Sequence, residues 1–530
     1  MSGGTILACY LKQLVPDRLR REAPENVFKG KLLIGLFATC LATESPNHAQ
    51  ALDEPSGSLE IEFSSHEIEV SEDADIRLLF TGPLTAKHTD DVVVVTTEGE
   101  HEQAYKSRFV DVYSLEGDAF HHVASTHVPA RHMDIWTYQD GVALLSAHSE
   151  GIDRFDASTG MFVPWLIIAE GSAKQKPLEK YYLSNFSRDL NGDDLDDIVY
   201  VSGEELIIRT QLHDEELADP VVLSTSPRSE PRFSLEIDSP LTPREVLQLQ
   251  HSEVGWQFSI YPTDYDGDGV IDLAIPYFEP DNEEGGGLWI HQGLREDGWK
   301  TGSTQVPIVA PTLDSRTSQH LFRIQDFNND GIGDAAVFRL GEERLSHMDF
   351  YFGRHERGET VFPKSADTSI SLNGWSVRLT EFSDLDGDGD IDFCAAPSRR
   401  GVGRVLGNLV RRSVSLILEC YLMNDGAFSD VPSKVLKLHH PTDTPMPATL
   451  ADVTGDGILD FVAPARKNRL KVYVGTGDAN VFATHPIVVD IQLPKNGETI
   501  LFRDLNRDSK SDMLVVPLDT GHPVWVALSQ

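Results

Sequence analysis

The chain has 530 residues, of which 40% are hydrophobic and 24% are charged, as in an ordinary water-soluble globular protein. Its 84 acidic residues outnumber its 45 basic residues, so the formal net charge at pH 7 is -39. An electrostatic field of this sign repels the phosphates of nucleic acids and of anionic lipids, and we therefore expect neither as a partner.

A targeting segment is the first element that the sequence predicts. Residues 29–51 contain two lysines, then an apolar run from 32 to 42, then a polar stretch that ends in Ala-Gln-Ala. This order is typical of a secretory signal with an Ala-x-Ala cleavage site, and the apolar run is too short for a permanent transmembrane helix. We expect residues 1–51 to be a signal or leader region and the protein to be exported, either to the periplasm or as a secreted protein.

The start of this leader has two interpretations. Val27 is the true first residue if an alternative start codon encodes it, in which case residues 1–26 are a misassigned extension; otherwise these residues form an amphipathic leader helix. Cys40 could instead be a lipoprotein cysteine, although Phe37 and Thr39 fit such a site poorly. N-terminal sequencing of the mature protein distinguishes these cases.

Three strand-rich segments follow the leader. Residues 59–70 alternate between apolar and polar side chains, as an exposed strand does. Residues 76–115 and 132–160 each contain three strand-like runs and form two early repeats. The first keeps only Asp90 and Asp91 between its first two runs, and the second has no acid there, so we expect no metal ion in either.

Six copies of a nine-residue loop pattern organise the rest of the chain. Each copy has oxygen-bearing side chains at positions 1, 3, 5 and 9, and the copy from Asp264 to Asp272 is the most regular. Calcium takes six to eight oxygen ligands in irregular geometry, and glycine at position 6 allows the positive φ that folds the backbone around an ion. The predicted side-chain ligands are Asp189, Asn191, Asp193 and Asp197; Asp264, Asp266, Asp268 and Asp272; Asp326, Asn328, Asp330 and Asp334; Asp384, Asp386, Asp388 and Asp392; Asp452, Thr454, Asp456 and Asp460; and Asp504, Asn506, Asp508 and Asp512. The predicted carbonyl ligands at position 7 belong to Leu195, Val270, Ile332, Asp390, Ile458 and Lys510.

Some copies depart from the pattern. Asp194 and Ser509 stand at position 6, where the other copies have glycine, and Thr454 replaces an acid or amide at position 3. Arg507 and Lys510 add positive charge to the last copy. An EF-hand also begins with this spacing, but it requires a glutamate at position 12 followed by a helix. No copy has a carboxylate at position 12, and a strand-like apolar run follows each loop, so the pattern predicts loops between strands.

The spacing of the loops predicts a β-propeller. Successive copies begin 52 to 75 residues apart, and strand signals fill the intervals with almost no helical periodicity, which is typical of four-stranded propeller blades. With the two early repeats, residues 52–530 form one all-β propeller of eight blades, or of seven if one early repeat is only an insertion. The last repeat has three strand signals, so we expect residues 59–70 to supply its missing outer strand and to close the ring.

These repeats resemble the FG-GAP or VCBS family, the calcium-loop propeller repeats of integrin α-subunit heads and of many secreted bacterial proteins. The loops carry the resemblance, together with Tyr351-Phe352-Gly353 and the Pro that follows a small residue at 397, 464 and 517. The resemblance covers residues 180–530 strongly and 75–180 weakly. It implies that each loop lies between the first two strands of a blade and that the side chains named above bind up to six structural calcium ions.

Two segments interrupt the repeats. Residues 213–252 are rich in Pro, Ser and Glu, and we interpret them as a surface excursion. Residues 398–412 contain five arginines and no acid; they are either a solvated hairpin loop or a site for a protein partner or an anionic glycan, because guanidinium groups bind carboxylates and sulfates bidentately. The arginines are Arg399, Arg400, Arg404, Arg411 and Arg412.

The remaining chemistry of the sequence favours a binding protein over an enzyme. It has no GxSxG elbow, HExxH helix, Walker loop or CxxC pair. Cys394 and Cys420 are expected on neighbouring strands of one blade, either as a disulfide or as two buried thiols. We therefore predict an exported calcium-binding propeller that acts as a binding, adhesion or scaffold module. The alternative is a secreted polysaccharide lyase or hydrolase that uses the propeller face or channel, with no transmembrane span in either case.

Overall fold

The computed structural model describes the part of the chain that begins at Ile61, with gaps. The leader, its alternative start and Cys40 therefore lie outside the described residues. The described ranges are 61–71, 74–85, 88–98, 108–117, 119–128, 132–138, 142–148, 150–167, 186–202, 205–212, 216–224, 260–278, 286–294, 298–308, 322–340, 346–372, 376–398, 413–441, 448–465, 469–491, 497–517 and 522–530.

Eight four-stranded antiparallel sheets make up the described residues, in the order expected of propeller blades. Blade 1 contains β2 (Ala74–Gly82), β3 (Asp91–Glu98), β4 (Arg108–Glu116) and β5 (Ala119–Val128), and blade 2 contains β6 (His132–Tyr138), β7 (Ala143–His148), β8 (Gly151–Asp156) and β9 (Met161–Ile167). Blade 3 contains β10 (Ser187–Arg188), β11 (Asp197–Ser202), β12 (Glu205–Arg209) and β13 (Val221–Ser224), and blade 4 contains β14 (Tyr261–Thr263), β15 (Asp272–Phe278), β16 (Gly286–His291) and β17 (Thr304–Ile308).

The second half of the chain repeats this arrangement. Blade 5 contains β18 (Phe322–Gln325), β19 (Asp334–Leu340), β20 (Ser346–Tyr351) and β23 (Thr368–Leu372), and blade 6 contains β24 (Ser376–Ser383), β25 (Asp392–Ser398), β26 (Ser413–Tyr421) and β29 (Lys434–Pro441). Blade 7 contains β30 (Thr449–Ala451), β31 (Asp460–Ala465), β32 (Arg469–Tyr473) and β33 (Ile487–Asp490), and blade 8 contains β34 (Gly497–Arg503), β35 (Asp512–Pro517), β36 (Val524–Ser529) and β1 (Phe63–Ile68). Two small hairpins, β21 (Arg354–Glu356) with β22 (Glu359–Val361) and β27 (Met423–Asn424) with β28 (Ala427–Phe428), extend blades 5 and 6.

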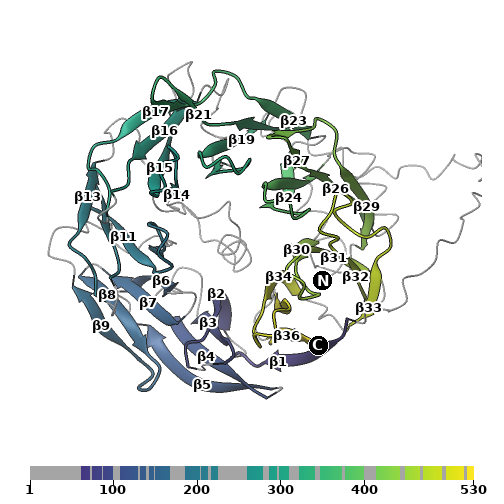
Figure 1. Cartoon of the computed structure of the whole chain (residues 1–530). Coiled ribbons are helices and arrows are strands. Elements are labelled where there is room, and N and C mark those ends of the chain that lie inside the picture. The colour runs from purple at the N-terminus through teal and green to yellow at the C-terminus, as the bar shows by residue number, and fades with distance from the viewer. Residues whose placement is uncertain are drawn as a thin grey trace, which may run out of the picture. The chain divides into compact units, whose positions relative to one another are not determined.

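The blades form one ring in chain order (Figure 1), so the all-β propeller of eight blades is confirmed and the alternative of seven is wrong. The ring is closed by the N-terminal strand, as predicted. β1 pairs with β36 from Phe63 opposite Ser529 to Ile68 opposite Val524. Ile68 is 1% exposed and packs in a core cluster that joins blades 8 and 1. The outer edge of β36 is therefore covered by residues that lie more than 400 positions earlier in the chain.

The hydrophobic core is divided among the interfaces between blades. Each of eight clusters of buried side chains joins two successive blades, and one of them joins blade 8 to blade 1. Because both faces of a sheet pack against neighbours, its central strands are apolar without alternation. In β3, for example, the run from Val92 to Val95 is at most 3% exposed throughout. This packing explains why the sequence shows short continuous apolar runs in place of the alternating pattern of a half-exposed sheet.

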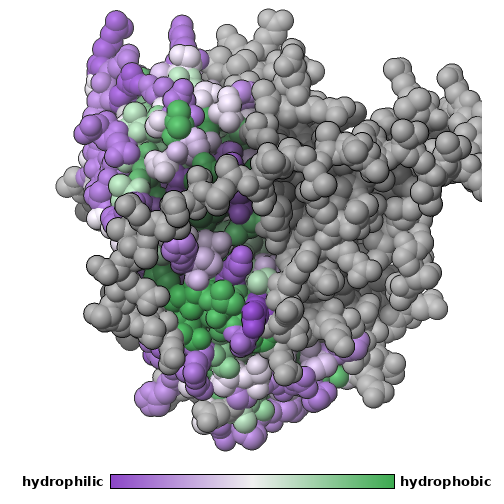
Figure 2. All heavy atoms as spheres, turned by 90° about the vertical axis from the view of Figure 1, so that its right-hand side faces the viewer, coloured by the Kyte–Doolittle hydropathy of each residue, from purple (hydrophilic) through white to green (hydrophobic). Residues whose placement is uncertain are grey.

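Most of the exposed side chains in the described part are polar. Figure 2 shows one side of the molecule, where hydrophilic residues border a hydrophobic area. The most exposed large hydrophobic residues are Ile167 and Met161, at the two ends of the outer strand β9, and Val431, between β28 and β29. The described residues contain no helix, so they include no helix that could cross a membrane.

The two interruptions have different outcomes. Part of the segment 213–252 belongs to a blade, because residues 221–224 form β13 and pair with β12. The excursion there was therefore placed too early, since the short run Val-Val-Leu-Ser completes blade 3; residues 225–252 lie outside the described ranges. In the segment 398–412, Ser398 ends β25, and all five arginines lie outside the described residues.

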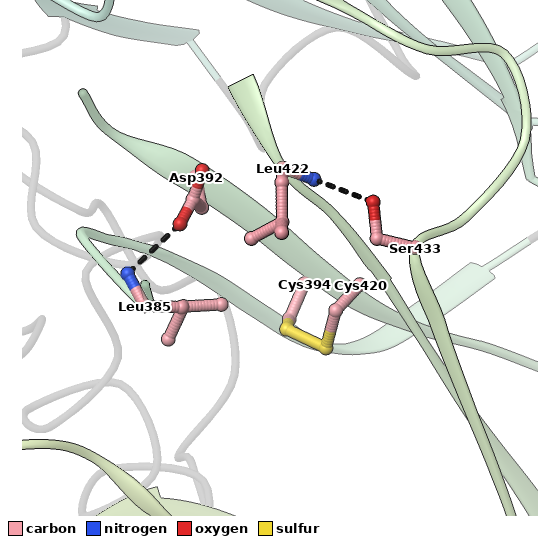
Figure 3. The surroundings of a disulfide bond; sticks show 6 residues. All are labelled: Leu385, Asp392, Cys394, Cys420, Leu422 and Ser433. Carbon is pink, nitrogen blue, oxygen red and sulfur yellow. Dashed lines mark hydrogen bonds between the residues drawn. A yellow bond between two sulfur atoms is a disulfide. The ribbon is translucent and has the colours of Figure 1, made fainter. Parts of the chain in front are cut away.

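Cys394 and Cys420 form a disulfide between β25 and β26 of blade 6 (Figure 3). They are directly paired across the two strands, their Cα atoms are 4.0 Å apart, and both side chains are completely buried. The predicted placement on neighbouring strands is confirmed, and of the two states left open the disulfide is the one observed. The bond closes a loop with a sequence separation of 26 residues next to Asp392.

We expect the double variant Cys394→Ala/Cys420→Ala to lose about 3 kcal/mol of unfolding free energy, because the bond restricts the unfolded chain over that loop. Chemical denaturation of the wild type and the variant, both in excess calcium, measures the loss. Because both sulfur atoms are buried, a reductant without denaturant should leave the wild-type bond intact. Equal stability of the two proteins would contradict a stabilising role for the bond.

Candidate metal centres

The six predicted loops all lie between the first and second strands of blades 3 to 8, which confirms the position that the family resemblance implied. In all six loops, position 1 directly follows the first strand and position 9 is the first residue of the second strand. Each of blades 3 to 8 therefore carries one acidic loop at the same end.

The aspartate at position 1 folds each loop around itself. In the copy that starts at Asp264, its Oδ1 accepts the backbone N–H of Gly267 at 2.8 Å and its Oδ2 accepts that of Gly269 at 2.8 Å. The bond from position 6 to position 1 is present in all six loops. The aspartate at position 5 likewise accepts the N–H of the position-7 residue in all six, as Asp268 does from Val270 at 2.9 Å. The loops are thus held in one conformation by their own carboxylates.

Positions 4 and 6 require a left-handed backbone in every loop. The φ angle at position 6 is 80° at Gly269, and it is also positive at Asp194 (64°) and Ser509 (72°), the two departures from glycine. Position 4 shows the same requirement, which the sequence reasoning missed, with φ of 51° at Asn329 and 60° at Arg507. Residues other than glycine are strained in this left-handed region of the backbone.

We expect Ser509→Gly to stabilise the protein by about 1 kcal/mol, because it removes the strain of a side chain at positive φ. Denaturant unfolding of the variant and the wild type measures the gain. Gly331→Ala is the matched control at the same loop position: no atom lies within 4 Å of the added Cβ, so its expected loss of about 1 kcal/mol reports backbone strain alone. A destabilising Ser509→Gly would show that the serine side chain has another role.

The aspartate at position 9 connects the loop to the third strand of its blade. Asp334, for example, is completely buried; its Oδ2 accepts the N–H of Phe327 at 2.9 Å and its Oδ1 accepts that of Gly353 at 2.8 Å. The other five copies repeat this pair of bonds. We call this arrangement the position-9 clip. Its donors lie at the end of the third strand or two residues beyond it and are Gln211, Gly293, Gly353, Met423, Gly475 and Ser529.

The clip explains the glycine that lies two residues after the third strand in blades 4, 5 and 7. A Cβ atom on Gly293 would lie 2.4 Å from the carbonyl oxygen of Ile271, and one on Gly353 would lie 2.5 Å from that of Gly333. These distances are shorter than any van der Waals contact, so the backbone of the third strand can approach the loop closely only without a side chain. The sequence shows Gly353 after Phe352 but does not show its partner, which is the position-9 carboxylate.

Positions 1, 3 and 5 come together in two loops. Their candidate ligand atoms all lie within 4.8 Å of one another in Asp264, Asp266 and Asp268, and in Asp384, Asp386 and Asp388. One oxygen of the position-3 carboxylate, Oδ1 of Asp266 or of Asp386, is buried and has no hydrogen-bond partner. Such an oxygen is costly unless a cation or water binds it. Position 9 belongs to neither group.

The other four loops have a neutral side chain at position 3. Asn191, Asn328 and Asn506 each donate their Nδ2–H to the position-5 aspartate at 3.1 to 3.2 Å. Thr454 donates its hydroxyl to Asp452 at 3.4 Å. These contacts bring positions 3 and 5, or 3 and 1, together and reduce the repulsion between carboxylates. The position-3 side chain therefore contacts position 5 or position 1 in each of these four loops.

Burial raises the pKa of every position-9 aspartate above its usual value. Desolvation is the largest cause, and it raises the pKa of Asp334 to about 8 and that of Asp392 to about 7, although the two clip N–H groups oppose it. Neighbouring loop carboxylates raise these values further. Desolvation followed by repulsion from Asp388 also raises the pKa of Asp386. A bound cation would favour the ionised carboxylates and so reverse these shifts.

Blade 1 keeps the clip position but not the loop. Asp91, the first residue of β3, is completely buried and accepts the Oγ1–H of Thr85 at 2.8 Å through Oδ2. Asp90 pairs with Arg507 of the last loop, with Nη2 and Oδ1 3.0 Å apart, and its N–H donates to Leu505 at 2.7 Å. The positive charge of Arg507 therefore pairs with blade 1 at the point where the ring closes.

Neighbouring loops also contact one another. The N–H of Ile391 donates to the carbonyl of Phe327 at 2.7 Å, and the N–H of Ser511 donates to that of Asp452 at 2.7 Å. Gly267 lies so close to the next loop that a Cβ atom would be 3.2 Å from the carbonyl oxygen of Gly331. The acidic loops on this end of the ring therefore support each other as well as their own blades.

Comparison with known families matches one complete copy of this arrangement. Residues 384–463 match the FG-GAP-like repeat family, and the match begins at the first residue of one acidic loop and includes the next loop in full. The chain contains an FG-GAP-like repeat. Blades 3 to 8 share the loop, the position-9 clip and the four-stranded sheet, and residues 384–463 contain the loop and the clip of blade 6. None of the curated proteins matches the chain.

Solved structures also match. The WD40 domain of SCAP from fission yeast has 9% identity and a TM-score of 0.37, with 88% of this chain and 98% of that one covered. Hsv2 from Kluyveromyces lactis has 10% identity and a TM-score of 0.31, with 76% and 93% covered. The Tc holotoxin pore of Photorhabdus luminescens has 14% identity and a TM-score of 0.29; 82% of this chain is covered, but only 17% of the toxin chain.

Proposed function

We propose that the acidic loops of this FG-GAP propeller bind calcium as a structural ion. The observation that carries the proposal is the group of three carboxylates within 4.8 Å at Asp264, Asp266 and Asp268, in which Oδ1 of Asp266 is buried and has no partner. An all-oxygen donor set in a loop of irregular geometry fits calcium better than magnesium or a transition metal. The group at Asp384, Asp386 and Asp388 repeats the observation in blade 6.

Calcium at these loops would supply positive charge that offsets the repulsion between neighbouring carboxylates. The ligands would be the residues at positions 1, 3 and 5, the carbonyl oxygen of position 7 and the second lone pairs of position 9, up to a total of six ions. The loops at Asp189, Asp326, Asp452 and Asp504 have no carboxylate at position 3, so their affinity for calcium should be weaker than that of the loops at Asp264 and Asp384.

The protein that these ions stabilise is best understood as an exported binding or scaffold module. The buried disulfide between Cys394 and Cys420 supports export, because such bonds persist in oxidising compartments. A rigid ring presents its loops on a fixed frame, where a protein or an anionic glycan can be bound. The arginine-rich segment 398–412 supplies the positive charge that such a glycan would require, in a chain with a net charge of -39.

Isothermal titration of the calcium-free mature protein with calcium tests the metal proposal. Binding of at least two ions, lost in part in Asp266→Ala and in part in Asp386→Ala, would support it. No binding at millimolar calcium would refute it. For the partner, retention of sulfated or carboxylated glycans by the calcium-loaded protein should fall when the five arginines are changed to serine, and unchanged retention would end that part of the proposal.

A further inference from the structure

The loop at Asp264 has a contact that the other loops lack. Gln292, which directly precedes the clip donor Gly293, donates its Nε2–H to Oδ2 of Asp266 at 3.0 Å. Its Oε1 accepts the Nζ–H of Lys300 at 2.6 Å, and the backbone N–H of Lys300 donates to the carbonyl of Gln292 at 2.9 Å. Asp266 is therefore attached to a side chain that is itself fixed at both ends.

The geometry divides the two oxygens of Asp266 between two roles. Oδ2 is occupied by Gln292, whereas Oδ1 is buried without a partner and is the oxygen left for a cation; Asp266 contributes one oxygen to the group of three carboxylates. A carboxylate that rotates freely must lose this freedom when it binds a cation, and one that is already fixed does not. Gln292 therefore holds the position-3 ligand ready, and Lys300 keeps Gln292 in place.

The loop at Asp384 is a natural control within the same chain. It also has aspartates at positions 1, 3 and 5, and Oδ1 of Asp386 is also buried without a partner. The residue that precedes its clip donor Met423 is Leu422, which is 3% exposed and has no side-chain group that can donate a hydrogen bond. In the remaining clips the corresponding residues are Thr210, Phe352, Val474 and Leu528, so none places an amide there.

We propose that Gln292, braced by Lys300, is a positioning residue that makes the loop at Asp264 the tightest cation site of the ring. The inference rests on the proposed calcium function. Compared with the loop at Asp264, the loop at Asp384 has one more carboxylate, Asp390, at position 7. A ranking of cation affinity by number of carboxylates would therefore place the loop at Asp384 above the loop at Asp264, and our proposal predicts the opposite.

Terbium luminescence can report this one loop. The Nε1–H of Trp299 donates to the carbonyl of Ile271, the position-8 residue of the loop, at 3.2 Å. Trp299 should therefore excite a terbium ion bound at Asp264, and the part of the tryptophan-sensitised signal that is lost in Trp299→Phe identifies this site. The titration uses the mature protein with its calcium removed.

We expect Gln292→Leu to raise the terbium concentration at half-saturation of this signal about tenfold, as other outer-shell changes do. Lys300→Met should raise it by less, and Leu422→Gln should leave it unchanged. The melting temperature in chelator should be the same for wild type and Gln292→Leu. A lower value in the variant would indicate that Gln292 has a merely structural role. An unchanged half-saturation in Gln292→Leu, with the signal abolished in Asp266→Ala, would overturn the inference. No sensitised signal in the wild type would refute the calcium proposal itself, and the inference with it.

Discussion

Removing calcium should lower the melting temperature of this protein by on the order of 15 °C. At a calcium concentration 100-fold above Kd, each site would stabilise the folded state by about 2.7 kcal/mol, and six sites by roughly 16 kcal/mol. An unfolding entropy of about 2.1 cal/mol/K per residue amounts to roughly 1 kcal/mol/K for the folded unit from Glu60 to Gln530, which converts that energy into the expected shift. Scanning calorimetry in calcium and in chelator measures it.

The physical reason for this expectation is the repulsion that folding builds into the loops. In two loops, three carboxylates are brought within 4.8 Å of one another, and without a cation their charges disfavour the folded state. Re-addition of excess calcium to the chelated protein should restore the original melting curve, which separates loss of the ion from other effects of the chelator. Superimposable curves with and without chelator would exclude a structural ion.

The fold was predictable because two independent signals in the sequence agree. The loop spacing defined the blades, and the continuous apolar runs such as Val92–Val95 indicated sheets buried on both faces. Closure by β1 followed from counting strands in the last repeat, where only three were present. The strand β13 was missed because Val221–Ser224 is short and lies within a stretch rich in Pro and Ser. Its strand character comes from pairing with β12, which sequence alone does not show.

The candidate site was only partly predictable. Carboxylate spacing identified positions 1, 3, 5 and 9, but it treated all four as equivalent ligands. The structure separates position 9, because Asp334 and its counterparts use both oxygens for backbone N–H groups. One of those groups belongs to the third strand, 19 residues away for Gly353, and no local pattern connects them. Gln292 was missed for the same reason, since it reaches Asp266 across 26 positions of sequence.

This separation of roles leads to the second large effect that we expect. Asp334→Ala should lower the unfolding free energy by about 4 kcal/mol even in chelator, because it leaves two buried N–H groups, those of Phe327 and Gly353, without an acceptor at about 1–3 kcal/mol each. The matched control is Asp330→Ala at position 5 of the same loop, where the side chain is exposed. Its loss should be below about 1 kcal/mol in chelator and should grow when calcium is present.

Denaturant titrations of both variants, with calcium and with chelator, distinguish the two roles. If the position-9 clip holds the blade together on its own, the effect of Asp334→Ala persists in chelator while that of Asp330→Ala nearly disappears. If position 9 acts only as a metal ligand, both effects disappear together. The first outcome would mean that the clip joins the loop to the end of the third strand whether or not an ion is bound. The buried aspartate would then be the part of the repeat that the fold itself requires, and the exposed carboxylates would be the part that serves the ion.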